Sequence, residues 1–301
     1  MQSNSKIGRL IPFITRKSSQ MANKIAPGWA SSKVDELMFV PKPDRKKTTR
    51  IPKEFKQFTL NSPQGQLQAY RTGSGPTVVF VHGWGGAASQ FFSLMRGLSQ
   101  CGFSALAFDH LGHGQSDEKQ TTIEQSILTT IHVLKFVTNN PDAGLCALVG
   151  HSTGCIAMAN AGSDLIREIP LFLISPVFNY RLYFLKKLVR LNLHSDIVKR
   201  YAAEFGRVYK RLYEPLELSQ NLPNNSDISV IVHDKSDNES ALTDSEGFCQ
   251  KYPLTRLVVT HKYDHYRIIN SESVWHELKS HLNYDDTTIN FIQNILPESP
   301  E

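Results

Sequence analysis

The sequence predicts one α/β domain, built on a mostly parallel sheet with helices on both faces. From Thr77 onward, short apolar runs alternate with longer amphipathic stretches, which is the pattern of a parallel sheet wrapped by helices. The apolar runs are rich in Val, Ile, Leu, Phe and Ala without strict alternation, as expected of strands covered on both faces. A chain of 301 residues, 40% of them hydrophobic, is long enough for one such core with an insertion.

About eight strands are expected. Two early runs at 55–60 and 66–71 flank a turn-like segment, so they predict an antiparallel hairpin at the sheet edge. The remaining strands are predicted at Thr77–Val81, Ser104–Phe108, Leu145–Val149, Pro170–Ile174, Ile228–Val232 and Arg256–Thr260. Helices are predicted at Ala88–Gln100, Thr122–Asn139, Thr153–Asp164 and Ser271–Leu282.

Residues 177–223 interrupt this alternation, since they hold amphipathic stretches with no convincing strand between them. We expect two or three helices here that form a small helical cap over the strand ends. The α/β core then comprises residues 55–176 and 224–296. Residues 1–54 form a basic N-terminal extension, because 13 Lys/Arg stand against 4 Asp/Glu within residues 1–57, whereas the whole chain carries +5.

The basic extension could make a weak contact with a membrane surface, although an arm that packs on the core is the simpler interpretation. Nucleic acid is not an expected partner, because aromatic residues are not interleaved with the basic ones and no nucleic-acid motif is present. The sequence shows neither a signal-peptide core nor an apolar run of about 20 residues, so we expect a cytoplasmic protein without a transmembrane segment. The four cysteines lack C-x-x-C spacing, which predicts free thiols.

The sharpest motif is Gly150-His151-Ser152-Thr153-Gly154, which lies directly after an apolar strand run and before a helical run. The pattern G-x-S-x-G arises by chance on the order of 0.1 times in a chain of this length. A serine hydroxyl is a poor nucleophile unless a tight turn projects it toward a base, and the flanking glycines permit that turn. Ser152 is therefore the predicted nucleophile.

A glycine-rich loop, His82-Gly83-Trp84-Gly85-Gly86, follows the strand run that ends at Val81. Such a loop can present a backbone N–H to an oxygen that becomes negatively charged during acyl transfer. The N–H groups of Trp84 and Thr153 are the predicted pair of donors for this oxyanion hole.

The acid and the base are expected after the last two strands. Asp234 and Asp237 both follow the run 228–232, and Asp237 is favoured because it lies further out on a loop. His261 continues the last strand, whereas His265 lies on the loop before the final helix and is the favoured base. The resulting order Ser, Asp, His differs from the orders in trypsin-like and subtilisin-like enzymes.

Four other histidines lie near predicted turns, at His82, His110, His113 and His151. Their spacing lacks a helical H-x-x-x-H pair or a nearby Cys/Asp shell, so no metal site is predicted and we expect structural hydrogen bonds instead. Acyl transfer through Ser152, His265 and Asp237 needs neither a metal nor an organic cofactor, so none is expected.

Together these motifs resemble the bacterial α/β-hydrolase superfamily. The resemblance covers roughly residues 55–282 and rests on His82–Gly86, Asp109–Asp117, Gly150–Gly154, His233–Asp237 and Asp264–Ile268. It implies the α/β-hydrolase fold, attack of Ser152 on an acyl carbon, proton transfer by His265, orientation of that imidazole by Asp237, and release of the acyl-enzyme by water. In two places the sequence departs from these relatives, which often have glycine where this chain has Cys155 and Asp264.

The implied activity is hydrolysis of a small-molecule carboxylic ester. Thioesterase, amidase, carbon–carbon bond hydrolase, acyltransferase and a non-catalytic ligand-sensing protein remain alternatives. Dehalogenases and epoxide hydrolases of the superfamily are not expected, because they use an aspartate at the position of Ser152. In the cap, Phe178, Tyr180, Tyr183 and Phe184 could line an acyl pocket, and docking of the cap on the core is an equally good interpretation of the same residues. The basic residues of the same stretch, Arg181, Lys186, Lys187 and Arg190, would favour an anionic substrate or a lipid surface.

Overall fold

The fold was obtained as a computed structural model, which describes residues 19, 21, 34–41, 51–140, 144–161, 163–166, 169–212 and 229–282. The described strands form one eight-stranded sheet in the order β1-β2-β4-β3-β5-β6-β7-β8. Their bounds are β1 Lys56–Ser62, β2 Gly65–Thr72, β3 Thr77–Val81, β4 Ser104–Phe108, β5 Leu145–His151, β6 Leu171–Ile174, β7 Ser229–Asp234 and β8 Arg256–Thr260.

The sheet is parallel from β4 to β8, while β1 and β2 form an antiparallel hairpin that joins it at β4. Strands β3 and β4 are buried along their full length, as continuous apolar strands between two helical layers should be. Because the parallel strands all end at the same edge, the loops that follow β3, β5, β7 and β8 lie near one another.

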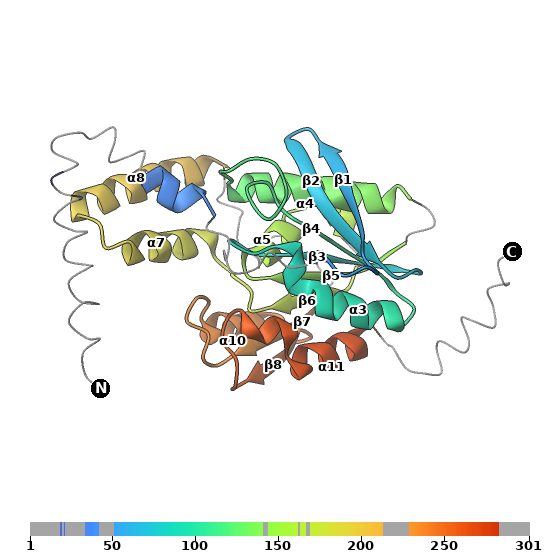
Figure 1. The fold of residues 1–301 in the computed structure, drawn as a ribbon. Helices are drawn as coiled ribbons and strands as arrows, with labels where there is room; N and C mark the ends of the chain where they lie inside the picture. The colour runs from blue at the N-terminus through green and yellow to red at the C-terminus, as the bar shows by residue number, and fades with distance from the viewer. Residues whose placement is uncertain are drawn as a thin grey trace, which may run out of the picture.

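Helices cover both faces of the sheet (Figure 1). One face packs against α4 (Ile123–Thr138), α5 (Thr153–Ala159) and α10 (Leu242–Lys251), and the other packs against η1 (Ala88–Phe91), α3 (Phe92–Gln100), η4 (Arg267–Asn270) and α11 (Glu272–His281). Each layer encloses its own apolar cluster, with Leu134 and Met158 in the first and Phe80 and Met95 in the second. This arrangement confirms the predicted fold class.

Several element predictions differ from the structure, among them those for α5, β7 and α10. The expected helix 153–164 ends at Ala159, where the Asn160 side chain donates to the carbonyl of Ile156, and a separate short helix α6 follows at Ser163–Ile166. Strand β7 extends to Asp234, since its polar last residues are buried among polar partners rather than exposed. Helix α10 was not predicted, because its sequence buries only Ser245 and Phe248 and so shows little apolar periodicity.

Between β6 and β7 the chain forms α7 (Tyr180–Arg190) and α8 (Ser195–Leu212). In Figure 1 these two helices lie beside the sheet layers rather than on either face. The Asn179 side chain caps α7 by accepting the N–H of Leu182. The rest of the predicted cap, residues 213–223, lies outside the described residues, as do 224–228 of the predicted core.

A helical segment at 34–39, within the predicted N-terminal extension, packs against α7 and α8. Val34 and Met38 share an apolar cluster with Phe184, Leu188 and Ile197. Two polar contacts hold the same segment, since Tyr201 donates to Asp35 and Thr121 N–H donates to the carbonyl of Phe39. Part of the extension is thus built into the helical unit, whereas most of residues 1–54, on which the predicted membrane-surface contact depends, lie outside the described residues.

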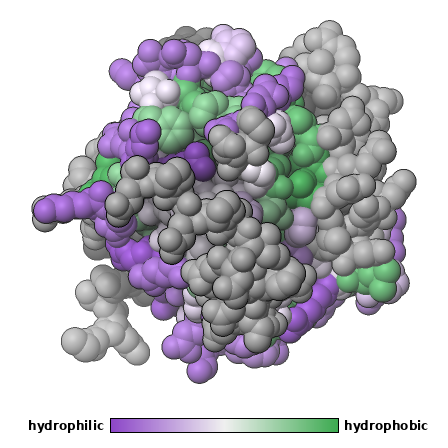
Figure 2. Space-filling model, turned by 90° about the vertical axis from the view of Figure 1, so that its right-hand side faces the viewer, coloured by the Kyte–Doolittle hydropathy of each residue, from purple (hydrophilic) through white to green (hydrophobic). Residues whose placement is uncertain are grey.

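Among the described residues, no helix is both long and apolar enough to cross a membrane. On the face shown in Figure 2, hydrophobic side chains gather in separate areas between hydrophilic ones. All four cysteines are free thiols, as predicted.

Asp109 ties the loops after β3 and β4 together. Its buried carboxylate accepts the backbone N–H groups of Ala88 and Gln115 at 2.7 and 2.9 Å. Ala88 begins η1, directly after the glycine-rich loop, so this carboxylate helps to set where that loop lies.

We expect Asp109→Ala to lower the free energy of unfolding by about 2–5 kcal/mol, because the buried N–H of Ala88 and the part-buried N–H of Gln115 lose their acceptor. Asp117→Ala is the matched control, since Asp117 also accepts a backbone N–H, that of Gln66, but is exposed. Water can replace that acceptor, so the control should lose less than about 1 kcal/mol. Urea unfolding of the two variants measures both values, and equal losses would contradict the role given to Asp109.

Candidate active site

Ser152 lies in a sharp turn between β5 and α5. Its backbone has φ 57°, in the left-handed region that non-glycine residues seldom occupy. Gly154 permits this turn, because a Cβ there would lie 2.3 Å from the carbonyl oxygen of Val81 in the neighbouring strand. The Ser152 N–H donates to the carbonyl of Ile174, so β6 holds the turn.

A continuous chain of hydrogen bonds joins Ser152, His265 and Asp237. The Ser152 hydroxyl oxygen lies 2.8 Å from Nε2 of His265, and Nδ1 of His265 lies 2.7 Å from Oδ2 of Asp237. Ser152 and His265 are each only 4% exposed, and the Asp237 side chain is fully buried. The three residues predicted from separate segments of the sequence thus meet at the carboxyl edge of the sheet.

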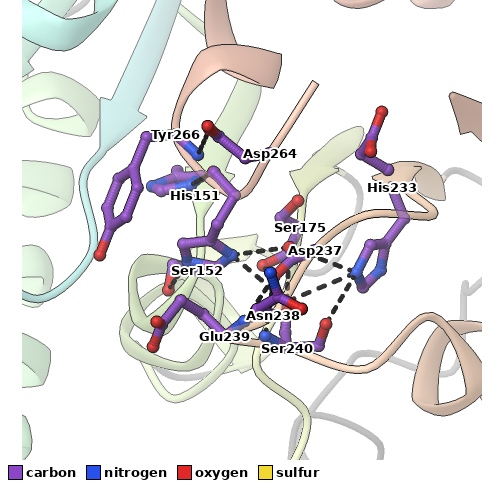
Figure 3. A network of polar contacts seen from close by, with 12 residues as sticks. His151, Ser152, Ser175, His233, Asp237, Asn238, Glu239, Ser240, Asp264 and Tyr266 are labelled. Atoms are coloured by element: carbon purple, nitrogen blue, oxygen red, sulfur yellow. Dashed lines mark hydrogen bonds and ion pairs between the residues drawn. The ribbon is translucent and has the colours of Figure 1, made fainter. Parts of the chain in front are cut away.

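Besides His265, four donors surround the Asp237 carboxylate (Figure 3). Its Oδ1 accepts the N–H groups of Glu239 and Ser240, while its Oδ2 accepts the Ser240 hydroxyl at 3.1 Å and lies 3.4 Å from Nε2 of His233. Burial would raise the pKa of this carboxyl, but the hydrogen bonds from His233 and His265 outweigh burial and hold the pKa well below its usual range. Asp237 is therefore a carboxylate at neutral pH.

His233 and Ser240 were not predicted as site residues. His233 is fully buried at the end of β7, where Nδ1 contacts the Ser245 hydroxyl of α10 at 2.7 Å and Nε2 faces Asp237. Because α10 was not predicted, the sequence offered no partner for this histidine. The only available signal was a histidine four residues before the favoured aspartate.

Asp234 and His261, the alternatives to Asp237 and His265, lie outside the chain of hydrogen bonds to Ser152. Asp234 accepts the Thr260 hydroxyl and the N–H groups of Lys262 and Tyr263, so it shapes the loop that carries His265. His261 is exposed just beyond β8. Neither residue contacts Ser152.

Asp264 likewise shapes this loop. Its carboxylate accepts the N–H groups of Tyr266 and Arg267 and pairs with the Arg267 guanidinium at 2.8 Å. The backbone hydrogen bond from Arg267 is the largest influence on the pKa of Asp264 and lowers it. The aspartate that stands in place of glycine thus bonds the backbone where η4 begins.

The two predicted oxyanion-hole donors lie side by side, but they differ in their present partners. The Trp84 N–H donates to the Thr153 hydroxyl at 2.8 Å. The Thr153 N–H, at the first position of α5, has no acceptor among the described residues. Gly83 brings this loop close to the nucleophile, since a Cβ on Gly83 would lie 2.7 Å from Cβ of Ser152.

The histidines predicted to be structural support the nucleophile and the glycine-rich loop. His113 accepts the Gly85 N–H, His82 accepts the N–H of His110, and His151 donates from Nε2 to the carbonyl of His265 at 2.8 Å. Burial lowers their pKa values, to about 3 for His110 and His151 and about 4 for His113. Within the described part of the chain, no group of three or more His, Cys, Asp or Glu side chains could hold a metal ion.

A hollow of about 170 Å³ opens beside the site between α7 and the loops. Two of the four predicted pocket residues line this hollow or the smaller one next to it: Tyr183 lines both and Phe178 lines the second. The other two are buried elsewhere, since Tyr180 packs with Ile156 and Val177, and Phe184 packs against the helical segment 34–39. In an amphipathic helix these two apolar rings face the core, so they dock α7 instead of lining the hollow.

A family model described as "Serine aminopeptidase, S33" matches residues 74–260. An uncharacterized protein of Mycobacterium tuberculosis and one of Mycobacterium bovis are each 30% identical over 114 residues. That alignment covers 37% of this chain and only 33% of either relative, so the chain matches about a third of their length.

Solved structures with a similar fold include an esterase of Pyrococcus furiosus, with a TM-score of 0.58, 19% identity and coverage of 80% of this chain and 98% of that one. The structure of ferulic acid bound to Est1E of Butyrivibrio proteoclasticus has a TM-score of 0.56 and 16% identity, covering 78% of this chain and 99% of that one. An α/β serine hydrolase of Xanthomonas campestris, described as having no lid, has a TM-score of 0.53 and 16% identity. The match covers 83% of this chain and 99% of that one.

We expect stability to fall steeply between pH 6 and pH 5. The pKa values of His110, His113 and His151 are lowered in the folded protein, so unfolding takes up protons once the pH drops below the unfolded value near 6.5. Stability from this source is complete above about pH 6.5 and is lost as the pH falls toward the folded pKa values of about 4 for His113 and about 3 for His110 and His151. Each such histidine contributes a slope of about 1.4 kcal/mol per pH unit.

Urea unfolding at a series of pH values measures how the free energy of unfolding changes with pH, and hence how many protons the protein takes up when it unfolds. An uptake of less than one proton per molecule would contradict the burial of neutral histidines at the site. His276→Gln is the control, because the His276 side chain is 83% exposed. Its slope should match that of the wild type.

Proposed function

Because this chain belongs to the α/β-hydrolase family described as serine aminopeptidase S33, we propose that it is a serine hydrolase that cleaves carboxylic esters of small molecules through an acyl-enzyme. The observation that supports this proposal most strongly is the unbroken hydrogen-bond chain from Ser152 through His265 to Asp237. All three side chains are buried. Nε2 of His265 faces the Ser152 hydroxyl and Nδ1 faces the Asp237 carboxylate, which is the arrangement that the proposed proton transfer requires.

In the proposed reaction, Nε2 of His265 takes the proton of the Ser152 hydroxyl as the oxygen attacks the ester carbonyl. Asp237 accepts the Nδ1–H of His265, which leaves Nε2 free to act as the base and stabilises the imidazolium that forms. The imidazolium then protonates the leaving alcohol. Water, deprotonated by the same nitrogen, attacks the acyl-enzyme and releases the acid and the serine hydroxyl.

The oxyanion hole of this proposal consists of the N–H groups of Trp84 and Thr153. The Thr153 N–H lies at the start of α5, where the helix dipole also favours negative charge. The Trp84 N–H must exchange its present acceptor, the Thr153 hydroxyl, for the substrate oxygen. A threonine hydroxyl can rotate about χ1, so this exchange needs no movement of the backbone.

Thioesters, amides and activated carbon–carbon bonds would be cleaved by the same groups, and a ligand-sensing protein could keep the same pocket. The strained φ of Ser152 favours an enzyme over a ligand-sensing protein. Backbone strain costs free energy, and strained residues are found most often at active sites, where they hold a reacting group in position.

The proposed nucleophile predicts covalent labelling of the purified protein by a fluorophosphonate probe, and hydrolysis of p-nitrophenyl esters of graded chain length. Ser152→Ala should abolish both. Ser175→Ala is the matched control, because this buried serine lies at the end of the neighbouring strand and its hydroxyl has no partner among the described residues. Labelling that persists in Ser152→Ala, or is absent from the wild type, would refute the proposal.

Asp237→Asn should lower kcat by about 10³–10⁴-fold with little change in KM, because an amide can donate to Nδ1 of His265 and so favours the wrong tautomer. The matched control is Asp264→Asn on the same loop as His265, where the carboxylate bonds Arg267 and not the imidazole. Steady-state kinetics of both variants test the assignment. A comparable loss in Asp264→Asn would contradict it.

A further inference from the structure

His233 turns a hydrogen-bond donor toward the carboxylate of the proposed triad. It lies near the end of β7, fully buried, with Nε2 3.4 Å from Oδ2 of Asp237 and 3.3 Å from the carbonyl oxygen of Ser240. A carboxylate and a carbonyl can only accept hydrogen bonds. Nε2 of His233 therefore carries a proton and shares it between these two oxygens.

The other nitrogen of this ring is held by a helix that covers the sheet. Nδ1 lies 2.7 Å from the hydroxyl of Ser245, a fully buried residue of α10. In the neutral ring Nδ1 is an acceptor, because Nε2 carries the proton, so the Ser245 hydroxyl donates to it. This one hydrogen bond fixes both the orientation and the tautomer of His233.

Two histidines share one oxygen of Asp237. Nδ1 of His265 lies 2.7 Å from Oδ2, and Nε2 of His233 lies 3.4 Å from the same atom. The chain of contacts that starts at Ser152 therefore continues past the carboxylate to α10. Burial is the largest influence on the pKa of Asp237 and raises it, while the hydrogen bond from His233 is the largest influence that lowers it. The His233 donor thus helps to keep a buried carboxylate charged.

Packing alone does not account for a histidine at this position. Strand β7 is buried along its full length, and the three residues before His233 are apolar. A buried imidazole costs free energy of desolvation, which an apolar side chain would not, unless its nitrogens are bonded. In His233 both nitrogens have partners, and these lead to Asp237 on one side and to α10 on the other.

We propose that His233 is a positioning residue for the proposed reaction. Its Nε2–H holds Oδ2 of Asp237 within hydrogen-bond distance of His265 and takes up part of the charge of that oxygen. His233 thereby limits how strongly Asp237 stabilises the imidazolium that forms on His265. The inference rests on the proposed function, because His233 acts only through the acid and the base of that mechanism. It also gives α10, through Ser245, a part in setting the strength of the base.

The titratable rings in contact with His265 keep one charge state near neutral pH. The His151 ring lies 4.8 Å from the His265 ring, and burial lowers the pKa of His151 to about 3. Tyr266 lies edge-on at 5.0 Å, and burial raises the pKa of its hydroxyl. The charged residues further out are exposed or paired: Asp244 and Glu246 of α10 are exposed, Glu239 pairs with Arg190, and Asp264 pairs with Arg267. A shift of the pH profile near neutral pH therefore reports on His265 and Asp237.

The test compares two substitutions at position 233. His233→Leu should lower kcat roughly tenfold, because Oδ2 of Asp237 is no longer held and a hydrogen bond to a charged group is lost. It should also move the acid limb of the pH profile of kcat/KM to higher pH by about 0.5–1 unit, because Asp237 then stabilises the imidazolium more strongly. KM should change little, since His233 does not line the hollow beside the site. His233→Gln should restore kcat and the acid limb, because its amide can donate to the same oxygen.

Ser245→Ala tests the same chain of contacts from its far end and keeps the histidine. Without the hydroxyl the tautomer of His233 is no longer fixed, so the acid limb should move in the same direction by a smaller amount. Ser229→Ala is the matched control, since Ser229 is a buried serine of β7 whose hydroxyl has no partner among the described residues. Its pH profile should equal that of the wild type.

Rates are measured with one p-nitrophenyl ester at a series of pH values on both sides of pH 7. Fluorophosphonate labelling gives the concentration of competent sites, and tryptophan fluorescence at each pH gives the folded fraction. Rates per folded, labelled site separate protonation of the base from unfolding at low pH.

The outcomes distinguish this inference from the proposed function. Labelling of the wild type together with an unmoved acid limb in His233→Leu would overturn the inference and leave the proposed function standing. Equal losses of kcat in His233→Leu and His233→Gln, with the limb unmoved, would assign His233 to packing alone. If His233→Leu does not fold, Ser245→Ala beside Ser229→Ala decides in the same way. Absence of labelling in the wild type would remove both proposals.

Discussion

Parallel pairing of the strands from β4 to β8 is the constraint on which the rest of this structure depends. It brings the carboxyl ends of β3, β5, β7 and β8 to one edge, although the loops that follow them are far apart in sequence. The glycine-rich loop, Ser152, Asp237 and His265 each follow one of these strands. Because the helical layers bury both faces of the sheet, that edge is where polar side chains can gather without disrupting the core.

Burial determines which side chains at this edge of the sheet are charged. A buried carboxylate is costly unless donors surround it, and Asp237 has backbone, hydroxyl and imidazole donors around both oxygens. Several neighbouring histidines are kept neutral by the same lack of water, so they can hold loops in place without adding charge beside the proposed imidazolium. The cationic side chains of α7 lie further out, along the hollow beside the site.

The helices between β6 and β7 connect the site with the N-terminal part of the chain. Buried rings of α7 pack on one side against the core and on the other against the segment 34–39, and Lys187 links the carbonyl of Met38 to the ring of Trp84. An N-terminal segment that contacts no reacting group can thus influence the shape of the substrate site.

The sequence by itself determined the fold class and the proposed nucleophile, because strand burial and the turn around Ser152 leave local patterns in the chain: apolar runs at strand spacing, and glycines where backbones approach closely. It also placed one aspartate and one histidine after the right strands, yet left Asp234 and His261 as alternatives. Only the tertiary structure decided between them, and only it joined His233 to Asp237, separated Tyr183 from Tyr180 and Phe184, and set Lys187 over Trp84. These contacts join residues from different elements, and their distances depend on how the helices and loops pack, which spacing along the chain does not encode.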